Sequence, residues 1–189
     1  MAATDFNVSK FKGALKGGGA RPSLFDFTLT GVPTDVGTDL NNISYYCQVS
    51  ALPPLTVTPI EKTYFGRTVK IPGDIIFGDL STTIYQTEAG TERFGIEKWM
   101  DKINGHVDNK SSLENENKNF MGKYSAVGTL YQYAKDGETI LSVVEFVDLW
   151  PQSVSEIALS YDTASDIEQF DVTWAYNHYE TKIDSTIYK

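Results

Sequence analysis

The stretch Thr139–Pro151, T-I-L-S-V-V-E-F-V-D-L-W-P, predicts the central strand of the protein. Branched and aromatic side chains favour extended backbone, and side chains along a strand point alternately to two faces. One face would carry Ile140, Val144 and Phe146, and the other Thr139, Glu145 and Val147. We expect the closing Trp-Pro pair to end the strand, because proline cannot donate a ladder hydrogen bond.

A second strand-like run, S-A-V-G-T-L-Y-Q-Y-A at Ser125–Ala134, comes just before this stretch. The two runs are joined by Lys135–Glu138, which contains Asp-Gly, a strong short-range signal for a β-hairpin. We therefore predict one long hairpin over residues 125–149, with the rest of the chain pairing with it or covering it.

Composition sets the class of protein. The 189 residues suit a single domain, and an aromatic content of 13% favours β structure. The net charge of −9 argues against a sequence-reading nucleic-acid binder, which would carry a basic stripe. An acidic wall would instead keep a phosphate backbone from sticking. No apolar run approaches membrane-spanning length, so we expect a soluble protein made in a cytoplasm.

The order of elements predicts a mostly β, α+β domain over residues 1–189. Two packed antiparallel sheets would form a sandwich or barrel flanked by one helix at about 91–103, whose apolar residues follow helical spacing behind Thr91 as N-cap. Residues 1–20 would be a flexible arm, 21–180 the core and 181–189 a polar tail. Strands are expected at 24–29, 43–50, 56–60, 64–71, 75–77 with 80–85, 125–134, 139–149 and 167–178, with a turn at Pro72–Asp74.

No constellation of residues predicts catalysis, and we expect no metal and no cofactor. The single cysteine, Cys47, excludes a disulfide within the chain and is expected to be a small buried residue on a strand. His106 and His178 lack the spacing of a metal site. Trp150 and Trp174 could form a ligand platform, although aromatic residues on strands are more often core or interface.

Seven stretches, in order, resemble the tail tube proteins of contractile-tailed bacteriophages. They are Ala20–Phe25 (A-R-P-S-L-F), Tyr46–Pro53 (Y-C-Q-V-S-A-L-P), Gly66–Asp74 (G-R-T-V-K-I-P-G-D), the helix with Trp99, Gln132–Ala134 (Q-Y-A), Leu149–Val154 (L-W-P-Q-S-V) and Ile167–Val172 (I-E-Q-F-D-V). Their order and spacing agree from about residue 20 to 180. The loops 31–42 and 105–120 and the C-terminal extension depart from the pattern.

The resemblance implies a structural, non-enzymatic subunit of a virion. In that family six subunits form a ring, their inner sheets join into one barrel, and stacked rings form a tube inside a contractile sheath. The implied partners are further copies of the chain, the sheath protein, baseplate tube initiators, the tape measure protein and genomic DNA in the bore, without sequence-specific binding. The fold is shared with type VI secretion tubes.

Matching strands to this family places the hairpin 125–149 and the strands 44–50 and 64–71 on the inner wall. The candidate bore-facing residues are Gln48, Ser50, Thr68, Lys70, Thr129, Tyr131, Val143 and Glu145. The opposite face would be core: Cys47, Val49, Val69, Leu130, Val144 and Phe146. Candidate contacts between subunits or rings are Arg21, Pro22, Leu52, Pro53, Arg67, Trp150 and Pro151.

Three alternatives stay open at this point. The chain could be a baseplate-proximal tube initiator with the same fold, or the inner tube of a secretion or contractile injection system. From another class, it could be a carbohydrate- or ligand-binding β-sandwich that uses its tryptophans as a platform. Self-polymerisation of the purified protein separates the repeating subunit from an initiator. Genomic neighbours or the source of the particle separate a secretion or injection tube, and strong glycan binding by a monomer would favour the ligand-binding sandwich.

Overall fold

The structure is a computed structural model that describes residues 8–15, 18–33, 36, 40, 42–111, 124–163 and 166–183. The strands are β1 (Phe25–Thr30), β2 (Cys47–Ser50), β3 (Leu55–Tyr64), β4 (Arg67–Phe77), β5 (Leu80–Tyr85), β6 (Ala126–Tyr133), β7 (Ile140–Val154), β8 (Gln169–Ala175) and β9 (His178–Ile183). The helices are α1 (Val8–Ala14), α2 (Ile43–Tyr46) and α3 (Thr91–Ile103), with a 3₁₀ turn, η3 (Tyr161–Thr163). The mostly β class predicted from sequence is confirmed.

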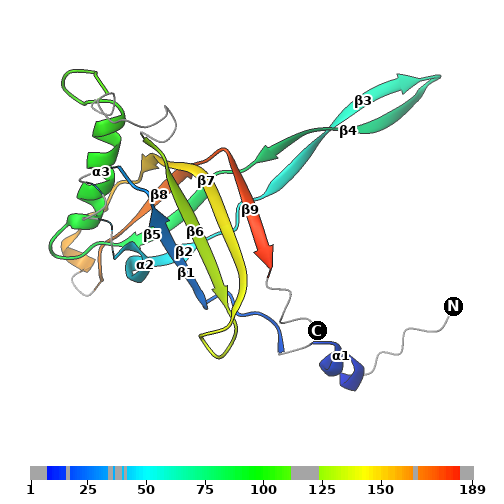
Figure 1. Ribbon diagram of the computed structural model, residues 1–189, viewed down its shortest axis with the longest axis horizontal. Coiled ribbons are helices and arrows are strands. Elements are labelled where there is room, and N and C mark those ends of the chain that lie inside the picture. Colours follow the sequence, from blue (N-terminus) through cyan, green and yellow to red (C-terminus); the bar gives the residue numbers. More distant parts are fainter. Residues whose placement is uncertain are drawn as a thin grey trace.

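Strand β7 connects the two sheets of the body. Its first part pairs with β6 on one side and β9 on the other, and its last part, from Trp150 to Val154, pairs with β8. Sheet A is therefore β1-β6-β7-β9, and sheet B continues as β7-β8-β5-β2. All pairings are antiparallel, and the predicted 125–149 hairpin is confirmed by the β6–β7 register. Figure 1 shows the two sheets meeting along β7, with α3 at one end of the body.

The change of partner along β7 occurs at Asp148, which has a positive φ of 58°. Its carboxylate accepts hydrogen bonds from the Ser125 hydroxyl at 3.3 Å and the Asn177 amide at 2.8 Å, and the Asn177 N–H donates to the Val147 carbonyl. Aspartate is among the few residues that tolerate the left-handed region. These bonds hold the strand where it leaves one sheet and enters the other.

The core fills the space between the sheets and beneath α3. Phe27 and Trp99 each lie against Trp174, with ring centroids 6.1 and 5.9 Å apart. The Trp174 indole N–H donates to the buried Thr82 hydroxyl at 2.8 Å, and the Trp99 indole donates to the Tyr124 carbonyl. Trp174 is therefore core, and the platform of two exposed tryptophans considered from sequence is wrong.

Several predicted boundaries are wrong because long-range pairing overrides local signals. Residues 43–46 are one helical turn, α2, and only 47–50 form a strand. Pro72–Asp74 lies inside β4, where Pro72 pairs with Pro59 next to a register shift, and is no turn. Pro151 does not end β7, which continues to Val154 with a register shift just after the proline. Both prolines thus lie next to irregular pairing, where a missing donor is tolerated.

Helix α3 has the predicted bounds, but its first turn differs from the prediction. Gly90, with φ 68°, is the N-cap in place of Thr91, and Phe94 is exposed, whereas Ile96 and Trp99 are buried. The buried Glu92 carboxylate accepts hydrogen bonds from the Thr87 N–H and hydroxyl and from the Thr91 hydroxyl. A carboxylate in the first turn also complements the helix dipole.

Stability is expected to fall in acid partly through Glu92. Burial alone would raise the pKa of its carboxyl group, but the hydrogen bonds outweigh burial and lower the pKa below its ordinary value. The stabilisation that the ionised Glu92 carboxylate gives to the folded state is therefore complete above the ordinary pKa, and it is lost as the pH falls through the folded-state pKa. At pH 7, Glu92→Gln should lose about 1–3 kcal/mol in urea unfolding, and the gap to the native chain should narrow toward pH 3. A pH-independent gap would contradict this role.

Candidate assembly surfaces

Strands β3 and β4 form a two-stranded ribbon that projects from the body (Figure 1). Every residue of β3 is exposed, as is most of β4. A two-stranded ribbon alone is at best marginally stable in water, and a long exposed ribbon with apolar side chains is a template for association.

The outer half of the ribbon has two chemically different faces. The register Ile60↔Ile71, Lys62↔Val69 and Tyr64↔Arg67 places four apolar side chains on one face, together with the basic side chains of Lys62 and Arg67. The other face carries Pro59 with Pro72, Thr63 with Thr68, and a Glu61–Lys70 ion pair at 3.3 Å. The first set is called the apolar ribbon face below: Ile60, Tyr64, Val69 and Ile71. Each of the four side chains is about half or more exposed within the chain.

The ribbon ends in a turn that carries a bare aromatic side chain. Phe65 and Gly66 both have positive φ, 45° and 75°, as in the two-residue turns that suit twisted hairpins. Phe65 is 91% exposed and contacts Tyr64 edge to face with ring centroids 4.5 Å apart. Lower on the ribbon, a Cβ at Gly73 would lie 2.6 Å from the Thr58 carbonyl, so the bulge there requires glycine.

Sheet A has two open edges among the described residues, along β1 and β9. The Tyr133 N–H donates to the Leu24 carbonyl, which fixes the hydrogen-bonding pattern between β1 and β6. In an antiparallel pair the hydrogen-bonded positions alternate, so Asp26 and Thr28 of β1 are the residues whose backbone groups bond to β6. The backbone groups of the intervening residues Phe25, Phe27 and Leu29 therefore point to the open edge. Such an edge offers donors and acceptors to a strand of another chain.

The face of sheet A opposite the core carries four of the predicted bore residues. Thr129 pairs with Glu145 and Tyr131 with Val143, so these four share one face, and Leu130, Val144 and Phe146 lie on the core face. Thr129 is itself buried within the chain, whereas the other three are partly exposed. The Lys182 ammonium group from β9 lies 2.5 Å from the Glu145 carboxylate on this same face. That contact raises the pKa of Lys182 above its ordinary value.

The other four predicted bore residues lie elsewhere. Gln48 and Ser50 lie on β2 at the edge of sheet B, and Thr68 and Lys70 lie on the polar face of the ribbon. Within the predicted core set, Cys47 is buried, but Val49 and Val69 are about half exposed, so that part of the prediction is wrong for the single chain. The reason is that β2 is an edge strand and the ribbon leaves the body.

The predicted contact residues divide by exposure. Arg21, Pro22 and Leu52 are exposed at one end of the body, and Arg67 flanks the ribbon turn. Pro53 and Pro151 are buried within the chain and are not available to a neighbour. Trp150 is partly buried, edge to face with Tyr124. Pro22 and Leu52 line a groove of about 210 Å³ together with Phe25, Ser50, Leu130, Gln132, Ser142 and Val144.

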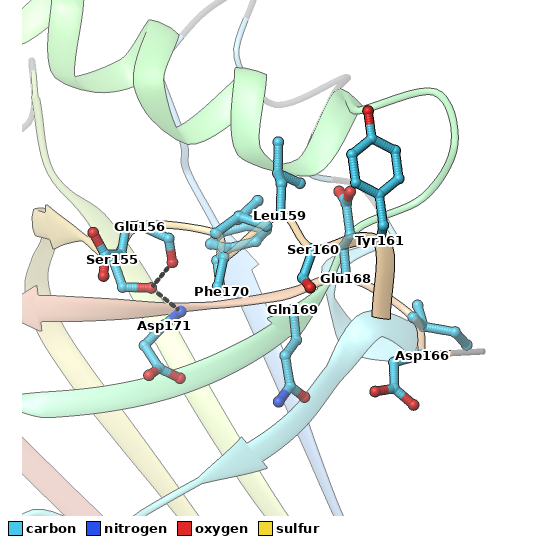
Figure 2. A pocket seen from close by; sticks show the side chains of 13 residues that line it. Ser155, Glu156, Leu159, Ser160, Tyr161, Asp166, Glu168, Gln169, Phe170 and Asp171 are labelled. Carbon is cyan, nitrogen blue, oxygen red and sulfur yellow. Dashed lines mark hydrogen bonds between the residues drawn. The ribbon is translucent and has the colours of Figure 1, made fainter. Parts of the chain in front are cut away.

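A larger groove of about 700 Å³ lies between the segment after β7 and the start of β8 (Figure 2). The Ser155 N–H donates to the Asp171 carbonyl, and the Asp171 N–H donates to the Ser155 hydroxyl oxygen. Arg93 of α3 donates to the Ser155 carbonyl at 2.8 Å and lies over the Phe170 ring, so the segment is held to the helix. Beyond that anchor, Leu159 and Tyr161 point away from β8 toward the side of α3 (Figure 2).

Two observations concern the titratable and metal-binding side chains of the described residues. No group of three or more His, Cys, Asp or Glu side chains among them is arranged to hold a metal ion. Burial, and secondarily the Asp26 carboxylate, raises the pKa of Cys47 to about 12, so the thiol stays protonated. Within the described part of the chain, no helix is long and apolar enough to span a membrane.

Sequence reasoning missed the ribbon, the groove and α1. The exposed turn at Phe65–Gly66 follows an alternating run and is a readable turn signal, but Pro72–Asp74 resembles a turn more strongly. The groove depends on how the segment after β7 folds back on β8, for which no local pattern exists. The loops 31–42 and 105–120 and the tail after 183 lie wholly or partly outside the described residues.

Two sheets that share one strand, two sheet edges left open among the described residues and a projecting ribbon define a mostly β protein with surfaces available for association. A family model described as phage tail tube protein matches residues 20–182. The tail tube protein gp19 of Enterobacteria phage T4 is 29% identical over 161 residues, 85% of this chain and 91% of that protein, and that of phage T6 is 30% identical over the same length. The chain belongs to the phage tail tube protein family.

Solved structures share the fold at low identity. The tube-terminating cap of the anti-feeding prophage matches with a TM-score of 0.62 and 12% identity, covering 87% of this chain and 91% of that one. A subunit of the PVC sheath–tube complex, an extracellular contractile injection system in its extended state, matches with a TM-score of 0.61 and 14% identity, covering 94% and 98%. These structures share the fold, and the family model with the two phage proteins confirms the family suggested by resemblance.

Proposed function

We propose that this chain is the repeating structural subunit of a viral tail tube and carries out no catalysis. Family membership over residues 20–182 is the observation that carries the proposal. The open edges of sheet A and the apolar ribbon face support it, because the described residues of a single chain leave both surfaces uncovered. The sheath–tube complex among the solved relatives supports a sheath partner, and a further relative from an injection-system baseplate, with a TM-score of 0.57, supports a baseplate partner.

Ring closure would use the edges of sheet A. If β9 of one copy pairs with β1 of the next, all copies share one continuous sheet, and neither edge stays open to unwanted association. The family resemblance implies six copies in the ring. The mature protein would then reside in the tail of a virion.

The bore would be lined by the sheet A face that carries Thr129, Tyr131, Val143 and Glu145. This face is opposite to the buried core face, and β9 adds Glu180 and Lys182 to it. Glu145 and Lys182 neutralise one another, which leaves hydroxyl groups and two further carboxylates, Glu180 of β9 and Asp26 of β1, which pairs with Tyr131. A wall of this kind has little attraction for phosphates, so genomic DNA and a tape measure protein would pass without sequence-specific binding.

Negative-stain electron microscopy of the purified protein at high concentration tests the proposal. Open-ended tubes of many stacked rings are the expected result. A protein that stays monomeric at every concentration would contradict it. Rings that form but never extend would favour a cap or initiator, a second candidate that the structural match to a tube-terminating cap supports.

A substitution at Leu52, in the smaller groove that Leu52 lines with Pro22, tests where rings meet. Leu52 is 60% exposed and lies next to Pro22, so a neighbouring ring would cover both. Leu52→Asp is expected to prevent long tubes and leave thermal unfolding of the monomer unchanged, because the side chain packs little within its own chain. Tubes of normal length from this variant would show that the Leu52 surface is not a contact between rings.

A further inference from the structure

The groove between residues 155–161 and 166–171 combines an apolar wall with acidic groups. Leu159, Tyr161 and Ile167 are at least two-thirds exposed, which is unusual for large side chains in a surface recess. The lining also contains Glu156, Asp166, Glu168 and Asp171, and none of the thirteen lining residues is lysine or arginine. Figure 2 shows the Glu168 carboxylate on the same side as Leu159 and Tyr161. An occupant should therefore be apolar on one face and basic beside it.

Helix α1 has this complementary chemistry. Val8, Phe11 and Leu15 recur at spacings of three and four, so they share one face, and all three are exposed. The helix buries none of its residues. Its charged residues are Lys10 and Lys12, and residues 8–15 contain no carboxylate. Because seven residues cannot hold a helix in water alone, α1 needs a surface to pack against.

Helix α1 does not occupy the groove of its own chain, because the two lie apart in the structure (Figure 1). Figure 1 shows α1 at the opposite end of the molecule from η3, which adjoins the groove. Residues 15–24 connect α1 to β1 and, fully extended, reach on the order of 30 Å, enough to extend to a neighbouring copy. Complementary surfaces at opposite ends of one chain make a head-to-tail contact, which repeats from copy to copy.

We infer that α1 of one copy docks in the groove of a second copy, with its apolar face on Leu159 and Lys12, which flanks that face, beside Glu168. The inference rests on the proposed self-assembly, and it adds a contact outside the residues that the family model matches, which begin at 20. The arm would join copies already in contact, so its local concentration raises the stability of the tube without a large interface.

Disulfide trapping tests the contact directly. In a chain with Phe11→Cys and Leu159→Cys, brief oxidation with copper–phenanthroline under assembly conditions should give a ladder of dimers, trimers and longer species. Cys47 is buried and serves as a constant background. The matched control keeps Phe11→Cys but carries Val107→Cys, which is 93% exposed on another loop, and should give no ladder.

The outcomes separate this inference from the proposed function. Tubes in the microscope without a ladder would overturn the arm contact and leave the tube function standing. A ladder from the control as strong as from the test chain would also overturn it. A single dimer band would indicate a closed two-fold contact, contrary to the head-to-tail arrangement.

A charge reversal gives a second readout that does not depend on cysteine chemistry. Lys12→Glu alone and Glu168→Lys alone should each raise the protein concentration needed for assembly by roughly fivefold to tenfold. The two changes in one chain should restore most of the loss. Absence of any restoration, with both single variants impaired, would overturn the pairing of α1 with this groove.

Discussion

Val69→Asp is expected to abolish tube assembly while the body of the subunit stays folded. Val69 lies on the apolar ribbon face with Ile60, Tyr64 and Ile71, and about half of its surface is exposed in the single chain. If that face is covered by a neighbouring copy, the new carboxylate has to be dehydrated there even though Lys62 lies opposite it, and we expect this to cost about 3 kcal/mol, which is a roughly hundredfold loss in the association constant. The ribbon contributes little to the core, so thermal unfolding should not change.

The adjacent Thr68 provides the matched control. It lies on the polar ribbon face opposite Thr63, so Thr68→Asp adds the same charge one position away and should still assemble. Analytical ultracentrifugation and negative-stain microscopy of both variants measure the effect. Equal assembly by the two variants would show that the apolar ribbon face is not a contact between copies.

Trp174→Ala is expected to cause the largest loss of folding stability. Trp174 is fully buried, packs against both Phe27 and Trp99, and donates a hydrogen bond to Thr82, which is itself fully buried. Truncation leaves a cavity and an unpaired hydroxyl group, and such changes cost about 3–5 kcal/mol. Since small domains are stable by only about 5–15 kcal/mol, most of this variant should unfold at temperatures that the native chain tolerates.

Urea unfolding measures this loss best in the Val69→Asp background, where assembly does not add to apparent stability. Thr82→Val is the companion variant: it retains the packing of Trp174 but leaves its indole N–H without the 2.8 Å bond, and should lose about 1–3 kcal/mol. If Trp174→Ala cost no more than Thr82→Val, the packing of the indole ring would contribute little and the account of the core would be wrong.

The two largest effects therefore separate folding from assembly. The core around Trp174 and Trp99 stabilises each subunit, whereas the ribbon and the edges of sheet A present surfaces that none of the described residues covers. A subunit of this kind can fold first and associate afterwards, because the residues responsible for each step do not overlap.

Local patterns in the sequence determined the elements whose signals are short-range. Alternation on both sides of Asp136-Gly137 predicted the β6–β7 hairpin, and helical spacing around Trp99 predicted α3, because each signal lies within one element or one turn. The alternation also placed Thr129 and Glu145 on the face opposite Val144, as the register shows.

Only the tertiary structure decided features that depend on partners far away in the chain. Pro151 lies inside β7 because that strand passes from sheet A to sheet B at Asp148, and a proline is tolerated beside the resulting irregular pairing. Strand β4 continues past Pro72 because Pro72 pairs with Pro59 of β3, next to the shift in register. The groove proposed to bind α1 exists because the residues after 154 fold back on β8. No periodic pattern in the sequence predicts that contact.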